Sequence, residues 1–302
     1  MDVSIIIVNY NTSKLINDCI ESIFKLVTDI DYEIIIVDNN TEDLSDTIVF
    51  HDNSQIKILQ LSENVGFGRA NNAGSMLAAG RNLFFLNPDT ILLNNAVKIL
   101  SDYLDSNPIC GACGGNLYDA NLNPVHSFRV IFPSIMWELN ELTRYKLEKI
   151  IYGESCQFNY SSQPKKVAYI TGADIMIRKN LFNQLNGFSN DFFMYYEETD
   201  LCKRIAKKGY SIISIPTSKI QHLEGKSYSC ENKNISFNPF RWTSMFESMF
   251  KYYSKHHSKA YCWLSFKIIN LTLWIKACLG SQKNKLIYDC LKKYTRKEKV
   301  IK

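Results

Sequence analysis

Short apolar runs alternate with helical patterns along the first part of the chain. Four of the runs are typical of buried strands: Val3–Val8, Ile34–Val37, Ile56–Leu61 and Leu83–Leu86. Strands that are separated by helical patterns usually lie parallel in one sheet, since each helix carries the chain back to the edge where it started. The pattern therefore predicts an α/β fold with a parallel sheet.

Each predicted strand ends in polar residues. These are Asn9-Tyr10-Asn11-Thr12, Asp38-Asn39-Asn40, Ser62-Glu63-Asn64 and Asn87-Pro88-Asp89-Thr90. In open α/β sheets, ligands bind in the crevice beyond the carboxyl ends of the strands. The polar side chains are thus expected where a ligand would bind, which indicates an enzyme.

The remaining pattern is mixed. Helices are expected at residues 12–27, 44–50, 94–104 and 197–208, and a small-residue helix ends at Gly80. Further strands are expected at 111–117, at 167–177 with an interruption at Gly172, and at 211–215. Residues 119–165 lack a clean period and are interpreted as an insertion, residues 232–239 as a linker, and the residues after Phe240 as helical.

Composition indicates a soluble protein of a reducing compartment. The 302 residues, 46% hydrophobic and 22% charged, are enough for one large domain or one and a half. A strand-like run begins at Val3, so no signal peptide is expected. Nine cysteines without regular spacing argue against a disulfide framework, and the single pair Cys110 and Cys113 favours packing over metal binding. The expected location is cytoplasmic.

Charge divides the chain into two parts. Residues 251–302 hold 13 Lys and Arg against 2 Asp and Glu, a net +11, while the first 250 residues hold 22 against 28, a net −6. A basic tail favours an anionic partner such as a membrane surface. Nucleic acid is not expected, because the aromatic residues of the tail follow helical spacing and form no stacking platform.

An apolar stripe runs along this tail with helical spacing. It consists of Tyr261, Leu264, Ile268, Leu271, Ile275 and Cys278, with Trp263 and Trp274 on its flank. Lys267, Asn270 and Lys276 interrupt the segment, which argues against a transmembrane helix. Two interpretations stay open: an interfacial anchor on anionic lipid, or a helix that packs on the rest of the chain or in a homodimer.

Asn87-Pro88-Asp89 is the first candidate for chemistry. Residues 87 and 89 point to the same side of an extended chain, and oxygen ligands so placed hold Mg²⁺ or Mn²⁺ against a diphosphate. The alternative is a plain turn, since these residue types also favour turns. His222, which follows a short predicted strand, is a candidate metal or diphosphate contact, although a lone histidine is more often structural.

The segment Glu197-Glu198-Thr199-Asp200 is the second candidate. Glu198 shares a helical face with Leu201, Cys202 and Ile205, so it is expected to point inward, whereas Asp200 and Arg204 are expected to form an outward pair. An inward carboxylate at a helix start is a candidate general base. The alternative is that these acids only complement the helix dipole.

Gly66-Phe67-Gly68 follows the third predicted strand. It lacks the third glycine of a dinucleotide fingerprint, and no Walker A sequence occurs. Asn64, Arg69 and Asn71 are still able to reach a nucleotide or phosphate across this loop.

With these residues in view, the chain resembles the inverting nucleotide-sugar glycosyltransferases of family 2, which have the GT-A fold. It is most similar to the bacterial rhamnosyltransferase-type members that build O-antigens and related surface polysaccharides. The matching segments are SIIIVNYNT (4–12), EIIIVDNN (33–40), ENVGFGRANNAG (63–74), FLNPDT (85–90), TGADIMIR (171–178), GFSNDFFMYYEETDLCKRI (187–205) and QHLEGKS (221–227). The resemblance covers residues 1–228, the expected catalytic domain, and leaves 229–302 as a basic, helical C-terminal region.

The resemblance implies roles for individual residues. The donor would be bound by Asn9, Asn11, Thr12, Asp38 (facing the base), Asn39, Asn64, Gly66, Gly68, Arg69, Asn71, Asn87 and Asp89. Asp89 would be the metal-binding acid of the DXD element, with Asn87 in place of the first acid, and Gly172-Ala173-Asp174 would border the acceptor. Glu198 stands where the family has its Asp base, and its longer side chain keeps Glu197 and Asp200 as alternatives.

The activity that follows from the resemblance is metal-dependent, inverting sugar transfer that requires Mg²⁺ or Mn²⁺. The expected donor is dTDP-L-rhamnose and the expected acceptor a glycan, lipid-linked at the inner face of the plasma membrane. Two alternatives remain: a UDP-hexose or UDP-N-acetylhexosamine donor, or a catalytically inactive scaffold that binds nucleotide sugars.

Overall fold

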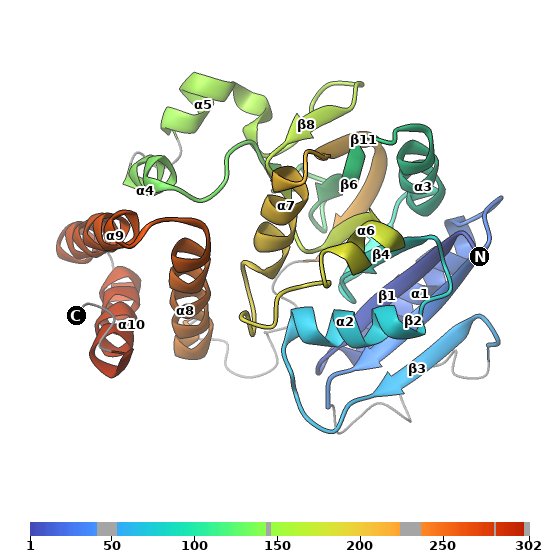
Figure 1. Ribbon diagram of the computed structural model, residues 1–302, viewed down its shortest axis with the longest axis horizontal. Coiled ribbons are helices and arrows are strands. Elements are labelled where there is room, and N and C mark those ends of the chain that lie inside the picture. Colours follow the sequence, from blue (N-terminus) through green and yellow to red (C-terminus); the bar gives the residue numbers. More distant parts are fainter. Residues whose placement is uncertain (41–52, 143–145, 224–236, 281, 299–302) are drawn as a thin grey trace.

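The computed structural model describes residues 1–40, 53–142, 146–223, 237–280 and 282–298 (Figure 1). The helix expected near residues 44–50 lies outside the described residues, as do most of the expected linker and the boundary between residues 228 and 229.

Within the described residues, nine strands form one mixed sheet. They are β1 (Val3–Asn9), β2 (Tyr32–Asp38), β3 (Ile56–Gln60), β4 (Asn82–Leu86), β5 (Thr90–Leu92), β6 (Cys110–Tyr118), β8 (Lys165–Val167), β10 (Asp174–Arg178) and β11 (Ser211–His222). Their order is β3-β2-β1-β4-β10-β6-β11-β5, and β8 pairs with β11. Strands β3, β2, β1 and β4 are parallel, while β10 runs antiparallel to both of its neighbours.

A second sheet consists of β7 (Phe128–Arg129) and β9 (Tyr169–Ile170). The apolar run at 167–177 is therefore divided between elements of different sheets and not a single strand. Gly172 lies in the connection between β9 and β10.

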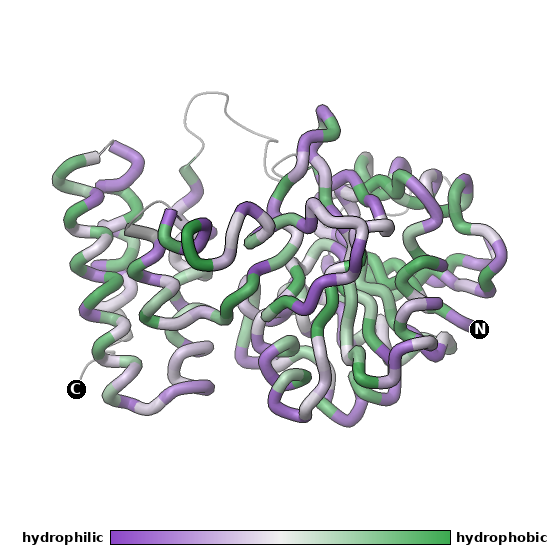
Figure 2. Tube along the Cα trace, turned by 90° about the horizontal axis from the view of Figure 1, so that it is seen from above, coloured by the Kyte–Doolittle hydropathy of each residue, from purple (hydrophilic) through white to green (hydrophobic). Residues whose placement is uncertain are grey.

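Helices cover both faces of the main sheet. On β1, Ile5 and Ile7 pack toward α1 (Ser13–Leu26) and α3 (Ala96–Ser106). Ile6 and Val8 point to the other face, toward α2 (Phe67–Leu77), α6 (Lys179–Gln184) and α7 (Glu197–Lys207). This alternation follows from the two-residue period of a strand, and it explains why the central strands are hydrophobic along most of their length (Figure 2).

The third expected strand is less buried than its apolar run predicts. β3 lies at the edge of the sheet, where only Ile56 is buried and Ile58 is 41% exposed. Two elements had no clear signal in the pattern. β5 is three residues long and follows a turn, and α6 is shorter than two helical turns.

The C-terminal helices form a second apolar core beside the sheet (Figure 1). They are α8 (Pro239–His256), α9 (Lys259–Leu279) and α10 (Gln282–Glu298). The insertion contributes α4 (Ile135–Leu142), α5 (Lys146–Tyr152) and a 3₁₀ turn (Glu154–Cys156). α4 packs on α9, and the Ile135 backbone N–H donates to the Tyr261 hydroxyl at 2.8 Å.

Candidate active site

The carboxyl ends of β1 and β2 bring the first predicted site residues together. The Asn9 amide donates to Asp38 Oδ1 at 3.3 Å, and both side chains are fully buried. The Thr12 hydroxyl donates to Asn9 Oδ1 at 2.8 Å. Asn11 has a left-handed backbone (φ 56°) in the turn between β1 and α1. Its side chain is exposed beside this group. We call Asn9, Thr12, Asp38, Asn39 and Asn64 the strand-end cluster.

Asn39 and Asn64 extend the cluster to the loop before α2. The Asn39 amide donates to Asn64 Oδ1 at 2.8 Å, and Asn64 Oδ1 also accepts from the Gly66 backbone N–H at 3.0 Å. Gly66 has φ +88°, and a Cβ there would lie 2.2 Å from the Phe193 carbonyl oxygen. Only glycine fits this position, which joins the loop to the segment before α7.

Gly68 allows a second close approach between the same two segments. A Cβ at Gly68 would lie 3.4 Å from Glu197 Cβ. Asn71 is buried one turn later, where its amide donates to the Phe67 carbonyl oxygen at 3.1 Å. Its Oδ1 has no hydrogen-bond partner among the described residues, and its reach to a nucleotide stays a prediction.

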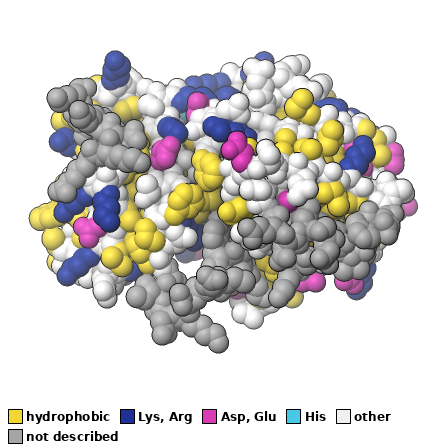
Figure 3. Space-filling model, turned by 90° about the horizontal axis from the view of Figure 1, so that it is seen from below, with side chains coloured by type: hydrophobic (Ala, Val, Ile, Leu, Met, Phe, Trp, Pro, Cys, Tyr) yellow, Lys and Arg dark blue, Asp and Glu magenta, His cyan; other side chains and the backbone are white. Residues whose placement is uncertain are grey.

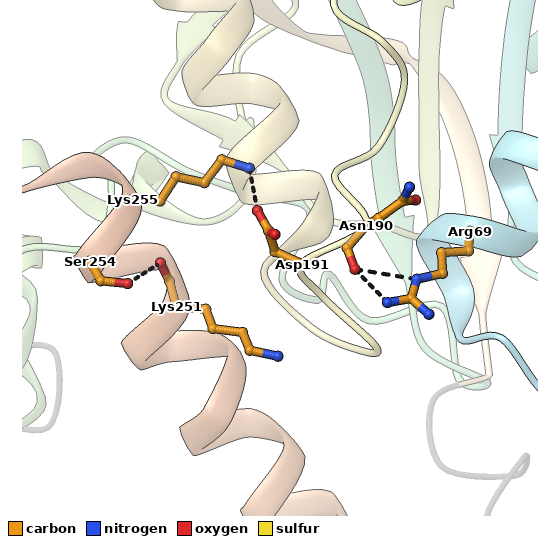
Figure 4. Close-up of a pocket in the computed structure, with 6 residues that line it drawn as sticks. All are labelled: Arg69, Asn190, Asp191, Lys251, Ser254 and Lys255. Atoms are coloured by element: carbon orange, nitrogen blue, oxygen red, sulfur yellow. Dashed lines mark hydrogen bonds and ion pairs between the residues drawn. The ribbon is translucent and has the colours of Figure 1, made fainter. Parts of the chain in front are cut away.

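Arg69 does not join the strand-end cluster. Its guanidinium donates to the Asn190 carbonyl oxygen at 2.6 Å (Figure 4). Together with Lys251 and Lys255 it lines a separate hollow of about 360 Å³ between α2, the loop at 189–191 and α8. The donor contact expected of Arg69 stays a prediction, and in this structure its guanidinium bonds to the loop carbonyl instead.

Asn87, Asp89 and His222 come together although 133 residues separate the last two. His222 Nε2 lies 3.3 Å from Asp89 Oδ1 and 3.4 Å from Asn87 Nδ2. The antiparallel pairing of β5 with β11 places His222 opposite Thr90, and the Leu223 backbone N–H donates to the Asp89 carbonyl oxygen at 2.9 Å. Asn87-Pro88-Asp89 is thus a turn that also presents its side chains to His222.

These three side chains fit a divalent cation. A carboxylate, an amide oxygen and an imidazole nitrogen are ligands that Mn²⁺ accepts, and Mg²⁺ takes the oxygens. Within the described ranges no group of three or more His, Cys, Asp and Glu side chains could hold a metal. A cation held by Asp89 and His222 would therefore need further ligands from outside these side chains.

The acidic segment, Glu197–Asp200, begins α7. Glu197 is 5% exposed, and its Oε2 has no hydrogen-bond partner among the described residues. Burial and the nearby Glu198 carboxylate raise the pKa of Glu197 well above its usual range. Glu198 is half-buried and accepts from the Thr199 hydroxyl at 2.9 Å, and burial raises its pKa as well.

Asp200 is fully buried, so its predicted outward position is wrong. Its Oδ2 accepts from Arg204 Nε at 2.7 Å and its Oδ1 from His256 Nε2 at 2.8 Å. Burial alone would raise the pKa of Asp200, but the His256 hydrogen bond and the Arg204 charge together lower it. The periodicity of α7 assigned Asp200 to the solvent because it contains no sign that α8 covers that face.

Gly172 lies beside Glu198, and the next residue, Ala173, lies beside Asn87. A Cβ at Gly172 would be 3.8 Å from Glu198 Cγ, and the Asn87 backbone N–H donates to the carbonyl oxygen of the next residue, Ala173, at 3.0 Å. The candidate base and the Asn87-Pro88-Asp89 turn therefore contact neighbouring residues of the connection between β9 and β10.

Ala173 and Asp174 differ from Gly172 because both are buried. The Asp174 carboxylate accepts from the Gly115 backbone N–H at 2.6 Å, inside the sheet. Burial raises the pKa of Asp174 well above its usual range. Of the three residues expected at the acceptor, only Gly172 is partly exposed.

Two tyrosines directly before the acidic segment were not predicted as site residues. Tyr195 and Tyr196 have left-handed φ values of 70° and 67°, and Tyr196 is the N-cap of α7. Consecutive non-glycine residues in this region are strained and cluster at functional sites. No periodic pattern in the sequence predicts such a backbone. The aromatic run at 192–196, directly before the acidic segment, is the one local signal at this position.

Comparison with known proteins identifies the family. The family described as Glycosyl transferase family 2 matches residues 4–185, more than half of the chain. The chain belongs to glycosyl transferase family 2. The N-terminal domain of galactosyltransferase also matches, at residues 154–226. The predicted family is confirmed, and the protein is a glycosyltransferase.

The chain is similar to curated rhamnosyltransferases. The N-acetylglucosaminyl-diphospho-decaprenol L-rhamnosyltransferase of Mycobacterium tuberculosis is 24% identical over 225 residues, which cover 67% of this chain and 70% of that protein. The dTDP-rhamnosyl transferase RfbF of Shigella flexneri is 23% identical over 295 residues, which cover 94% of this chain and 90% of that protein.

A solved structure shows the same fold. The mannosyltransferase PcManGT from Pyrobaculum calidifontis, in complex with GDP-Man and Mn²⁺, has a TM-score of 0.57 at 15% identity, covering 99% of this chain and 81% of that one. The GT-A fold with a helical C-terminal region, expected from the sequence, is confirmed.

Proposed function

We propose that this glycosyltransferase moves L-rhamnose from dTDP-rhamnose to a hydroxyl group of a lipid-linked glycan, with inversion at the anomeric carbon. The observation that carries the proposal is that Glu198 approaches Gly172 while the Asn87 backbone N–H bonds to the next residue, Ala173, so the candidate base and the Asn87-Pro88-Asp89 turn meet the same connection between β9 and β10. The names of the similar rhamnosyltransferases support the sugar, the nucleotide and a diphosphate-lipid acceptor.

Different residues of the chain would bind the nucleotide and take the proton of the acceptor. The strand-end cluster would orient the nucleotide, since Asn9 and Asp38 lie at the carboxyl ends of adjacent parallel strands. Glu198 would take the proton of the acceptor hydroxyl, while the oxygen of that hydroxyl forms the new bond to the anomeric carbon. The bond to the diphosphate breaks on the opposite face, which inverts the configuration through an oxocarbenium-like transition state.

Glu198 is favoured over the other two acids by its surroundings. It is the half-buried member of the segment and faces Gly172, whereas Glu197 is buried against Gly68 and Asp200 is held by Arg204 and His256. A base in a site of low polarity has a pKa closer to neutrality, which strengthens proton abstraction. This assignment also rests on the family resemblance of position 198.

Asp89, His222 and Asn87 would hold Mg²⁺ or Mn²⁺. When bound, the cation neutralises the charge that develops on the leaving diphosphate. His222 is 9% exposed and Asp89 6% exposed, so both ligands are pre-positioned by the β5–β11 pairing.

A peripheral position on the inner face of the plasma membrane fits the surface of α9. One face of α9 packs into the C-terminal core through Phe266 and Ile269. The opposite face exposes Trp263 (51%), Leu271 (55%) and Trp274 (50%). Leu264, Leu271 and Cys278 of the stripe that the sequence indicated are exposed, and basic side chains adjoin hydrophobic ones over the C-terminal helices as seen from below (Figure 3).

Among the described helices, α9 is the one whose length and composition would allow it to cross a membrane, with a mean hydropathy of 1.3. We favour an interfacial position, since its other face belongs to the C-terminal core. Trp and Lys on one exposed helix face are typical of helices that lie on anionic bilayers. A homodimer through the same face is less favoured, because two copies of a net +11 region would repel each other.

A donor panel tests the proposed function. The purified protein is incubated with Mn²⁺ or Mg²⁺, a bacterial lipid extract and dTDP-rhamnose, UDP-glucose, UDP-N-acetylglucosamine or GDP-mannose, and release of nucleoside diphosphate is measured. We expect release from dTDP-rhamnose that depends on the extract. Release from a UDP-sugar instead would change the donor. No release from any donor, with nucleotide binding intact, would favour the inactive scaffold.

A further inference from the structure

Helix α8 lies outside both family matches, yet it contacts the segment that carries the candidate base. The matches end at residues 185 and 226, and α8 begins at Pro239. Three of its side chains bond to residues between 189 and 200. The C-terminal region is therefore joined to the active site as well as to its own apolar core.

The innermost of these bonds is the contact of His256 with Asp200. The His256 side chain is 2% exposed, and its Nε2 lies 2.8 Å from Asp200 Oδ1. On the other side of the ring, Nδ1 lies 3.1 Å from Lys207 Nζ. A lysine ammonium only donates, so Nδ1 accepts and Nε2 carries the proton that is donated to Asp200.

Two further bonds hold the chain just before the acidic segment. The Ser248 hydroxyl donates to the Met194 carbonyl oxygen at 2.8 Å. Lys255 donates to the Asp191 carboxylate at 2.9 Å and lies 3.4 Å from Asp200 Oδ1. α8 thus fixes residues on both sides of Glu197 and Glu198.

The backbone between these bonds needs such support. Tyr195 and Tyr196 both have left-handed φ values, and the Asp200 backbone N–H donates to the Tyr196 carbonyl oxygen at 2.8 Å. Strained residues persist only when their surroundings hold them in place. If the first turn of α7 shifted, the Glu198 side chain would move relative to Gly172, because Glu198 lies in that turn whereas Gly172 lies in the connection between β9 and β10.

We propose that His256 is a positioning residue for sugar transfer: by donating to Asp200 it holds the first turn of α7, so that Glu198 faces Gly172. This inference rests on the proposed function for its catalytic consequence. The C-terminal helical region then completes the catalytic unit in addition to any role at the membrane.

The matched pair H256Q and H256N tests the proposal. A Gln amide nitrogen occupies the place of histidine Nε2 and keeps the donor to Asp200, whereas the shorter Asn places its amide near Nδ1 and cannot reach. K251A serves as control, since Lys251 pairs with Glu247 on the exposed side of the same helix. The readouts are kcat, the KM for dTDP-rhamnose, and amide hydrogen exchange of the peptide that spans residues 194–204.

We expect H256N to lower kcat by about 10- to 100-fold, because small misplacement of a catalytic group has effects of this size. The KM for the donor should stay within about twofold, since among the described residues no identified hydrogen bond or ion pair joins α8 to the strand-end cluster, so binding of the donor is unchanged in the ground state and in the transition state. Exchange in residues 194–204 should be faster in H256N, and near the wild-type rate in H256Q and K251A.

Two results would overturn the proposal. One is equal kcat and equal exchange in H256N and H256Q. The other is faster exchange in H256N with unchanged kcat, which would leave His256 a purely structural residue. If the wild type shows no turnover with any donor, the proposed function fails, while the exchange comparison still decides whether His256 holds α7.

Discussion

At the scale of single residues, the three carboxylates of the acidic segment differ in their surroundings. Glu197 is buried without a partner for Oε2 among the described residues, Glu198 is half-buried beside Gly172, and Asp200 is bonded to Arg204 and His256. The sequence located the segment and put Glu198 first, but it could not predict the surroundings of Glu197 and Asp200, because these depend on α2 and α8, which pack on the segment from distant parts of the chain.

The first prediction concerns the base. E198Q should lower kcat by about 10²- to 10⁴-fold, the usual contribution of a general base. Binding of dTDP should be unchanged, because Glu198 lies beside Gly172, which is expected at the acceptor, and is not part of the strand-end cluster. Steady-state kinetics and calorimetry check both. E197Q is the matched control, and a larger loss of kcat in E197Q than in E198Q would move the base to Glu197.

The pH dependence of kcat follows from the same assignment. Glu198 must be deprotonated to act, and burial raises its pKa above the ordinary value of 4.5. The rate should therefore fall as the pH drops, with a midpoint above 4.5. This acid limb should be absent from the residual activity of E198Q. A limb that persists unchanged in E198Q would assign it to another group.

Asp174 predicts an effect on stability instead of activity. Its pKa in the folded state is raised by burial, so it favours folding below its unfolded pKa and loses this contribution as the pH rises through the folded pKa. D174N removes the loss of stability at high pH, because asparagine does not ionise, and the amide oxygen of Asn can still accept from the Gly115 backbone N–H. Thermal unfolding should show a larger gain in Tm for D174N at pH 8 than at pH 5. An equal loss at both values would contradict the account.

At the scale of elements, the buried parallel strands were predictable and the remaining ones were not. β1, β2 and β4 match their apolar runs within two residues, because strands covered on both faces read as continuous apolar sequence. β3 was predicted as buried because an edge position depends on what lies beside it. β10 was joined to β9 because no local signal marks a change of sheet at Gly172.

The loop before α2 gives a prediction at this scale. G66A and G209A carry nearly equal backbone strain, since their φ values are +88° and +89°. A Cβ at Gly66 would also meet the Phe193 carbonyl oxygen at 2.2 Å, whereas nothing lies within 4 Å of one at Gly209. We expect G209A to lose about 1–2 kcal/mol in denaturant unfolding and G66A clearly more. Equal losses would show that the contact relaxes without cost.

At the scale of the whole molecule, charge and hydrophobic surface coincide in the C-terminal region. The basic tail and the apolar stripe were both visible in the sequence, but only the fold separates the face of α9 that packs inward from the face that is exposed. His256 was missed altogether, since a contact between residues 200 and 256 leaves no periodic trace.

Vesicle binding tests the exposed face. The double variant W263A/W274A should bind vesicles that contain phosphatidylglycerol at least about tenfold more weakly, because it removes two large apolar side chains from the interface. Cosedimentation measures the difference. M76A is the control, as Met76 is 86% exposed on α2, away from this face. Two results would contradict contact of α9 with an anionic bilayer. One is equal binding of the wild type, W263A/W274A and M76A, and the other is equal affinity of the wild type for neutral vesicles and for vesicles that contain phosphatidylglycerol.

The central claim is a metal-dependent nucleotide-sugar site at the carboxyl end of the sheet, and calorimetric titration tests it most directly. UDP, dTDP and GDP are titrated into the wild type and D89A, each with Mn²⁺ and again with EDTA. The account predicts that the wild type prefers dTDP and binds it at least about tenfold more tightly with Mn²⁺, and that D89A loses this metal dependence. Binding of no nucleotide, or binding that is indifferent to both metal and Asp89, would contradict it.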